Sequence, residues 1–125
     1  MITKEIQLGG KPVTLGYCYA TEISFKLLSE GEDIQPFMLE AVQALSENRM
    51  PDTKKCVCLI LAAAMAYAES KEQDSPIDSK FLIYEASPAE LGTALGVVIG
   101  LWSEFYELPK GEPKEKEKKG RNGKN

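Results

Sequence analysis

The sequence contains no histidine among its 125 residues. Histidine is the commonest general base and metal ligand near neutral pH, so its absence removes the usual catalytic triads and most zinc sites. Catalysis would have to rely on carboxylates, lysine or cysteine, and no convergent acid, base and nucleophile stand out along the chain. We therefore expect a protein that is not an enzyme and that binds neither a cofactor nor a metal.

Cysteine is also scarce. Cys18, Cys56 and Cys58 are an odd number, and no secretory signal precedes them, so a reducing cytoplasm is the expected location. Cys56 and Cys58 lie on a helical pattern, where side chains two residues apart point about 200° apart and do not easily share one ion. We expect both to be small buried side chains.

Long apolar runs and a basic surplus are missing as well. The longest apolar run covers residues 56–68 and has 13 residues, whereas a helix needs about 20 to span a bilayer. Residues 1–108 hold 8 Lys and Arg against 16 Asp and Glu, while residues 109–125 hold 7 against 3. Because the apolar run is too short, we expect no membrane insertion. Because an acidic body repels phosphates, we expect no nucleic-acid binding either.

The remaining composition is that of a globular domain, with 43 % hydrophobic and 27 % charged residues. The chain length suits one domain better than two. Residues 109–125 are mostly Lys, Glu, Gly, Pro and Asn and have no apolar anchor except proline, which is typical of disorder. We predict a single helical domain over residues 1–108 and a disordered tail over residues 109–125.

The first segment predicts a β-hairpin. Residues 2–8 largely alternate apolar and polar side chains, and β-prone residues resume at Val13 after Gly9 and Gly10. A lone hairpin is marginally stable in water, so this one is expected to lie on the helices or to pair with another chain.

Four or five helices are expected to follow as a compact bundle, which makes the fold class mainly α. The first begins near Thr21 and ends at Gly31, and Asp33 is placed to cap a second one. The apolar stripe of that second helix consists of Phe37, Met38, Ala41, Val42 and Leu45.

A third helix, capped by Asp52 or Thr53, is apolar on nearly every face over residues 56–68, which predicts a central, buried position. Two further helices are expected to start at Ser75 and Ser87. Each serine is followed directly by a proline at the first helical position. An acidic residue stands two residues after that proline.

The last helix carries Gly92, Gly96 and Gly100 on one face. A glycine inside a helix costs about 1 kcal/mol relative to alanine, so three of them call for the gain that a closely packed neighbour supplies. Two neighbours are open at this point. The first is the alanine-rich segment of residues 62–68 in the same chain, and the second is a helix of another subunit or of a client protein, with Leu95 and other apolar residues around the glycines.

A resemblance to a known family rests on this order of parts. Ile6, Leu8, Gly9, Gly10, Lys11 and Leu15 form the hairpin pattern, and a Tyr/Ala/Ile helix start and compact helices follow. Over residues 2–108 the chain resembles the tail assembly chaperones of long non-contractile tailed phages and prophages.

The resemblance implies a non-enzymatic protein that binds the tape measure protein, or another phage tail protein, and keeps its hydrophobic helices soluble during tail assembly. It also implies contacts between copies of the chain, as in a homo-oligomer. The residues expected to bind protein lie on two helices and comprise Phe37, Met38, Val42, Gly92, Leu95, Gly96, Ile99, Gly100 and Trp102. A second interpretation is a structural head-tail connector or tail completion subunit, in which hairpin edges join copies into a ring.

Overall fold

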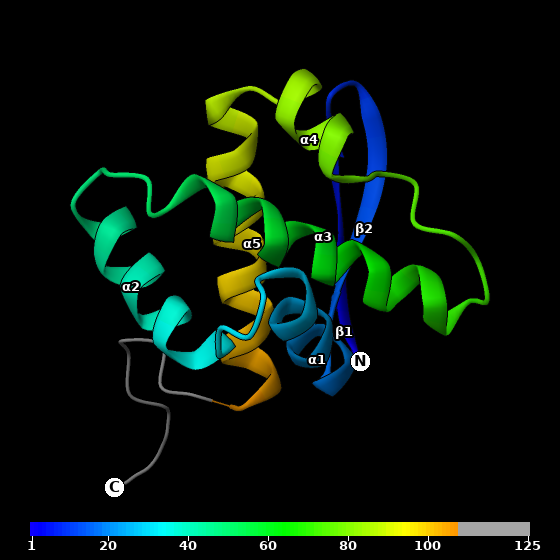
Figure 1. Cartoon of the computed structure of the whole chain (residues 1–125), viewed down its shortest axis with the longest axis horizontal. Helices are drawn as coiled ribbons and strands as arrows, with labels where there is room; N and C mark the ends of the chain where they lie inside the picture. Colours follow the sequence, from blue (N-terminus) through cyan, green and yellow to red (C-terminus); the bar gives the residue numbers. More distant parts are fainter. Residues whose placement is uncertain (108–125) are drawn as a thin grey trace, which may run out of the picture.

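The chain begins with the expected antiparallel hairpin. In the computed structural model, which describes residues 1–107, β1 (Ile2–Leu8) pairs with β2 (Lys11–Tyr17), so that Leu8 faces Lys11 and Ile2 faces Tyr17 (Figure 1). Gly9 and Gly10 make the two-residue turn with φ of +55° and +84°. A turn of this length needs positive φ values that glycine adopts without strain.

Five helices follow the hairpin, and α3 (Thr53–Ser70) is the central one. Asp52 caps it by accepting a 2.9 Å hydrogen bond from the backbone N–H of Lys55, one of the two caps that the sequence suggests. Residues 56–64 are all buried, which confirms the predicted central position and the burial of Cys56 and Cys58. The hairpin, α1 and α5 pack around this helix.

The hairpin lies on the helices rather than standing alone. Leu8, Val13, Leu15 and Tyr17 are buried, while β1 contacts α5 and β2 contacts α3. α4 (Ser79–Glu85) lies beside the turn of the hairpin (Figure 1). The ring of Phe81 on this helix lies against Gly9.

The next two helices are α1 (Tyr19–Leu28) and α2 (Ile34–Ser46). α1 begins two residues before Thr21, because the Thr21 hydroxyl accepts a 3.2 Å hydrogen bond from the backbone N–H of Cys18. Gly31 has a φ of +106°, as expected where a helix ends. Asp33 occupies the N-cap position of α2, but its side chain pairs with Lys26 at 3.0 Å instead of capping the helix.

The two predicted serine caps have different outcomes. Ser87 caps α5 (Pro88–Phe105) as predicted. The prediction for Ser75 is wrong, since α4 begins at Ser79 and its cap is Asp78, which accepts from the backbone N–H of Phe81 at 2.8 Å. The Ser75 hydroxyl closes a local turn onto Ile77 instead. The predicted tail, residues 109–125, lies outside the described residues.

Candidate protein-binding surfaces

The three glycines of α5 lie on the face of that helix that points away from the core. The opposite face is buried and consists of Ala94, Leu95, Val98, Leu101 and Trp102. A Cβ atom built on Gly96 or Gly100 meets no atom of the described residues within 4 Å, and one built on Gly92 meets only the Met50 sulfur at 3.9 Å. The first of the two alternatives, in which these glycines pack against the alanines of α3, is therefore wrong.

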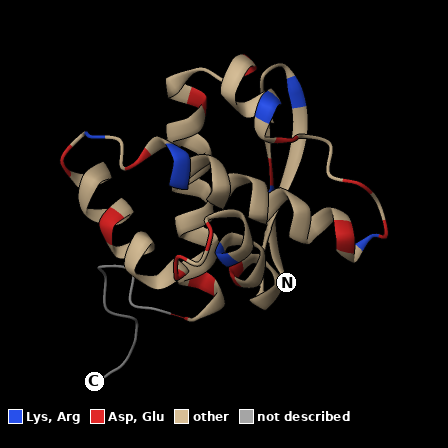
Figure 2. Cartoon of the chain, viewed as in Figure 1, with Lys and Arg blue, Asp and Glu red and all other residues tan. Residues whose placement is uncertain are grey.

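The orientation of α5 has a simple physical reason. Burying large apolar side chains such as Leu95, Val98 and Trp102 removes far more surface from water than burying three glycines. The helix therefore turns its bulky face to the core and leaves the glycine face outside. Residues 91–103 of α5 include no charged side chain, and the parts of this helix that are visible in Figure 2 are tan over that length, so its outer face is uncharged along more than three helical turns.

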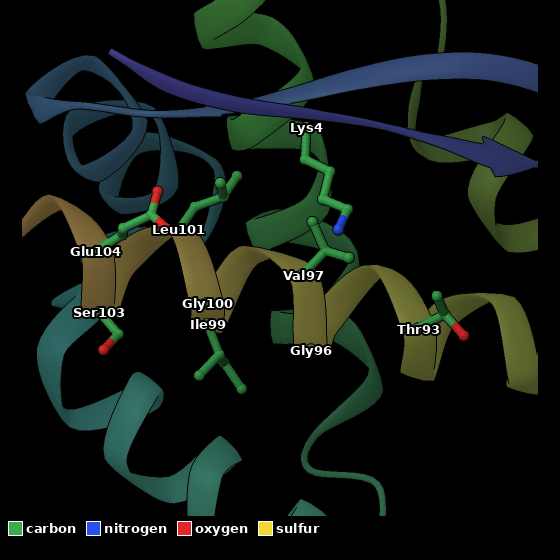
Figure 3. Close-up of a pocket in the computed structure, with 9 residues that line it drawn as sticks. All are labelled: Lys4, Thr93, Gly96, Val97, Ile99, Gly100, Leu101, Ser103 and Glu104. Atoms are coloured by element: carbon green, nitrogen blue, oxygen red, sulfur yellow. The ribbon is translucent and has the colours of Figure 1, made fainter. Parts of the chain in front are cut away.

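A shallow hollow of about 530 Å³ opens between this glycine face and β1 (Figure 3). The hollow is lined by Lys4, Thr93, Gly96, Val97, Ile99, Gly100, Leu101, Ser103 and Glu104. Lys4 extends from β1 over Val97, and Gly96 and Gly100 contribute bare backbone. The surface combines apolar side chains and exposed helix backbone with two hydroxyls, one amine and the carboxylate of Glu104, which suits contact with another polypeptide more than with a small molecule.

The residues expected to bind protein divide into two groups. Gly92, Gly96, Ile99, Gly100 and Val42 are at least partly exposed. Phe37, Met38, Leu95 and Trp102 are buried in the core of the chain.

The buried residues contact their own chain. The Phe37 ring stacks on Phe25 at 5.6 Å between ring centroids. The Trp102 indole N–H donates a 3.0 Å hydrogen bond to the Gln35 side chain, which satisfies its polar atom. These contacts stabilise the fold.

α1 exposes an apolar stripe that the sequence did not indicate as a surface. Tyr19, Ile23 and Leu27, spaced four residues apart, are all exposed, whereas Thr21 and Phe25 are buried. Apolar residues at a helical spacing are normally assigned to the core. The signal that could have revealed the exposed stripe is Thr21, whose hydroxyl has to reach the backbone of Gly16 and so turns this side of α1 inward.

A hydrogen-bonded cluster around Glu22 joins three helices to the hairpin. One carboxylate oxygen of Glu22 accepts from the Tyr17 hydroxyl at 2.8 Å, from the Tyr106 hydroxyl and from the Gln35 amide. Burial, followed by the bond to Glu22, raises the pKa of Tyr17 far above its usual range. The bond to Glu22 is also the main cause that raises the pKa of Tyr106, to about 12.

The thiols are poorly placed for reaction. Burial raises the pKa of Cys56 to about 12 and also raises that of Cys58, so both stay protonated at neutral pH. Within residues 1–107 no three His, Cys, Asp or Glu side chains come together as a metal site. Over the same part of the chain, no helix combines the length and the apolar character needed to cross a membrane.

A comparison of the chain with protein-family models, with curated proteins and with solved structures finds no match in any of the three.

Proposed function

We propose that the chain is a non-enzymatic protein-binding module of the phage tail assembly chaperone type. It binds the tape measure protein of a long-tailed phage or prophage in the cytoplasm of the bacterial host. Its role is to keep the hydrophobic helices of that client soluble until the tail tube assembles around them.

The observation that carries this proposal is the bare glycine face of α5. Gly96 and Gly100 weaken the helix without meeting any neighbour among the described residues. Glycines at a spacing of four allow a second helix to approach the backbone closely. A partner helix in the hollow beside β1 supplies the packing that the chain itself does not.

Exposed apolar side chains elsewhere support the same interpretation. Leu39 and Val42 on α2 are exposed, as is Met50 in the loop before α3. Isolated apolar residues on a surface are normal, but a chaperone needs adaptable apolar contacts of this kind.

Co-expression with the tape measure protein tests the proposal. We expect a larger soluble fraction of the client with the chain than without it. A Gly96→Leu, Gly100→Leu double variant fills the hollow and should abolish this gain, whereas Ser70→Leu adds apolar bulk at the exposed end of α3 and should leave the gain intact. The proposal fails if the client is equally insoluble with and without the wild-type chain.

The alternative, a connector or tail completion subunit, depends on the hairpin edge. Within the described residues β1 pairs only with β2, so its outer edge is open to another strand. Lys4 and Glu5 stand in the middle of β1, and charges at that place are typical of edges that avoid pairing. Mass spectrometry of purified mature particles separates the two functions, because a connector stays in the particle and a chaperone leaves it.

A further inference from the structure

Lys4 stands on the side of β1 where the other side chains are apolar. Residues two apart on a strand point to the same side of a sheet, so Lys4 shares its side with Ile2 and Ile6, which pack against the core. Directly across the hairpin from Lys4 lies Leu15, which is fully buried. A charged residue therefore interrupts the apolar side of β1 that faces the helices.

The bare face of α5 leaves room for this lysine. Its side chain extends from β1 over Val97 into the hollow beside the glycines (Figure 3). Gly96 and Gly100 line the same hollow and have no side chain to fill it. The methylene groups of a lysine can lie on an apolar surface while its amine stays in water, and Lys4 is exposed. The hollow therefore has a positive charge where β1 passes it.

No carboxylate of the described residues pairs with this amine. None of the ion pairs within residues 1–107 includes Lys4. Glu104 also lines the hollow, but it lies seven residues beyond Val97, which is about 10 Å along the helix axis. Acidic residues outnumber basic ones two to one in residues 1–108, so most of this surface repels a carboxylate, whereas the Lys4 amine attracts one.

A helix that covers the glycine face also covers the amine of Lys4, because both line one hollow. An ammonium group that is taken out of water is costly unless an opposite charge and hydrogen-bond acceptors replace the lost water. A client helix with only apolar side chains on its contact face would supply neither.

We propose that Lys4 determines specificity, and that the client helix carries an Asp or Glu side chain that pairs with the Lys4 amine. This inference rests on the proposed function and names the chemistry of the helix that the hollow accepts. The acidic residue fixes where the client helix lies along α5, since the bare glycine face by itself permits several positions. A helix with Lys or Arg at this place is rejected, because like charges that meet in an interface weaken binding.

Overlapping peptides from the tape measure protein test this inference. Peptides of about 25 residues are long enough to form a helix, and fluorescence anisotropy measures their binding to the full chain. In each peptide that binds, we expect one acidic residue whose replacement by Asn or Gln weakens binding about tenfold. Lys4→Glu should reverse the preference, so that a peptide with Lys in place of that acidic residue binds the variant more tightly than it binds the wild type.

Lys80→Glu is the matched control, because it changes the net charge of the chain by the same amount as Lys4→Glu. Lys80 is also exposed, and it lies on α4 outside the hollow. This variant should bind both peptides as the wild type does. Far-UV circular dichroism verifies that each variant is folded.

The inference is overturned if the bound peptides tolerate Asn or Gln at every acidic position, or if Lys4→Glu and Lys80→Glu change the affinities equally. A peptide that binds the wild type, fails to bind the Gly96→Leu, Gly100→Leu variant and ignores Lys4 would support the proposed function and contradict this inference alone. If no peptide binds the wild type, the proposed function fails together with the inference.

Discussion

Thr21 shows how one buried hydroxyl can orient a helix. It donates a 2.9 Å hydrogen bond to the carbonyl of Gly16 and accepts from the N–H of Cys18, with no exposure to solvent. Thr21→Val keeps the shape but leaves both backbone groups without this partner, so we expect the free energy of unfolding to fall by about 1–3 kcal/mol. Urea denaturation measures it, with the exposed Thr3→Val as the control, and an equal loss in both variants would contradict this role.

Tyr17 should make the chain sensitive to alkaline pH. Its pKa is raised in the folded state, mainly by burial, above the value of about 10 that an unfolded tyrosine has. The stabilisation that it contributes is therefore complete below about pH 10 and is lost as the pH rises further. We expect the difference in free energy of unfolding between wild type and Tyr17→Phe to be constant from pH 7 to about 9 and to shrink above pH 10.

Tyr84→Phe is the control for removing a tyrosine hydroxyl, because Tyr84 lies on the surface of α4. Since this side chain is exposed, the substitution should change the free energy of unfolding little. A constant difference between wild type and Tyr17→Phe up to pH 11 would show that burial does not hold the proton on Tyr17.

At the scale of elements, the sequence predicts boundaries well where a local cap determines them. Ser87 and Glu90 satisfy each other's backbone N–H groups, and the start of α5 follows from those residues alone. The same pattern fails at Ser75, because Ile77 is buried against the core and Lys11 donates to the carbonyl of Pro76 at 3.0 Å. Those contacts come from distant parts of the chain, and no local pattern reports them.

The candidate site was predictable in its residues but not in its orientation. The spacing of Gly92, Gly96 and Gly100 shows that they share one face of α5, whichever way that face points. Which face is buried depends on the competition among all the elements that pack on α3. For the same reason, helical spacing could not show that Phe37 and Trp102 are buried. For the exposure of Ile23 and Leu27, Thr21 is the one signal that the sequence contains.

Substitution of the α5 glycines should separate stability from binding. Gly96→Ala and Gly100→Ala add a methyl group where no described atom lies within 4 Å, so each should raise the free energy of unfolding by about 1 kcal/mol. If a helix packs closely on this face, the same variants should bind the client less tightly. Gly9→Ala should instead lower the free energy of unfolding. A Cβ at this position lies 2.6 Å from the Phe81 ring, and the backbone φ is +55°.

The Glu90 side chain connects α5 to the turn of the hairpin and should make this junction acid-sensitive. Its carboxylate accepts hydrogen bonds from the N–H groups of Ser87 at 2.9 Å and of Gly9 at 3.0 Å, which lower its pKa below 4.5. A lowered pKa in the folded state gives stabilisation that is present above about pH 4.5 and is lost as the pH falls through the lowered value. Melting temperatures from pH 6 to 3 should therefore fall more steeply in the wild type than in Glu90→Gln, and equal slopes would contradict this role.

At the scale of the whole molecule, α3 is the element on which the others depend. Ala63 lies at its centre without any exposed surface, and the hairpin, α1 and α5 all pack on the same helix. Ala63→Leu adds volume where none is free, so we expect a loss of about 1–3 kcal/mol in the free energy of unfolding.

Because the loss arises in the shared core, the whole described fold should unfold together. Far-UV circular dichroism follows all the helices, and the fluorescence of Trp102, the single tryptophan, follows the packing of α5 on α2 and the core. Coincident urea transitions in wild type and variant would establish this cooperativity, whereas a separate transition of Trp102 would show that α5 and its glycine face open independently of α3.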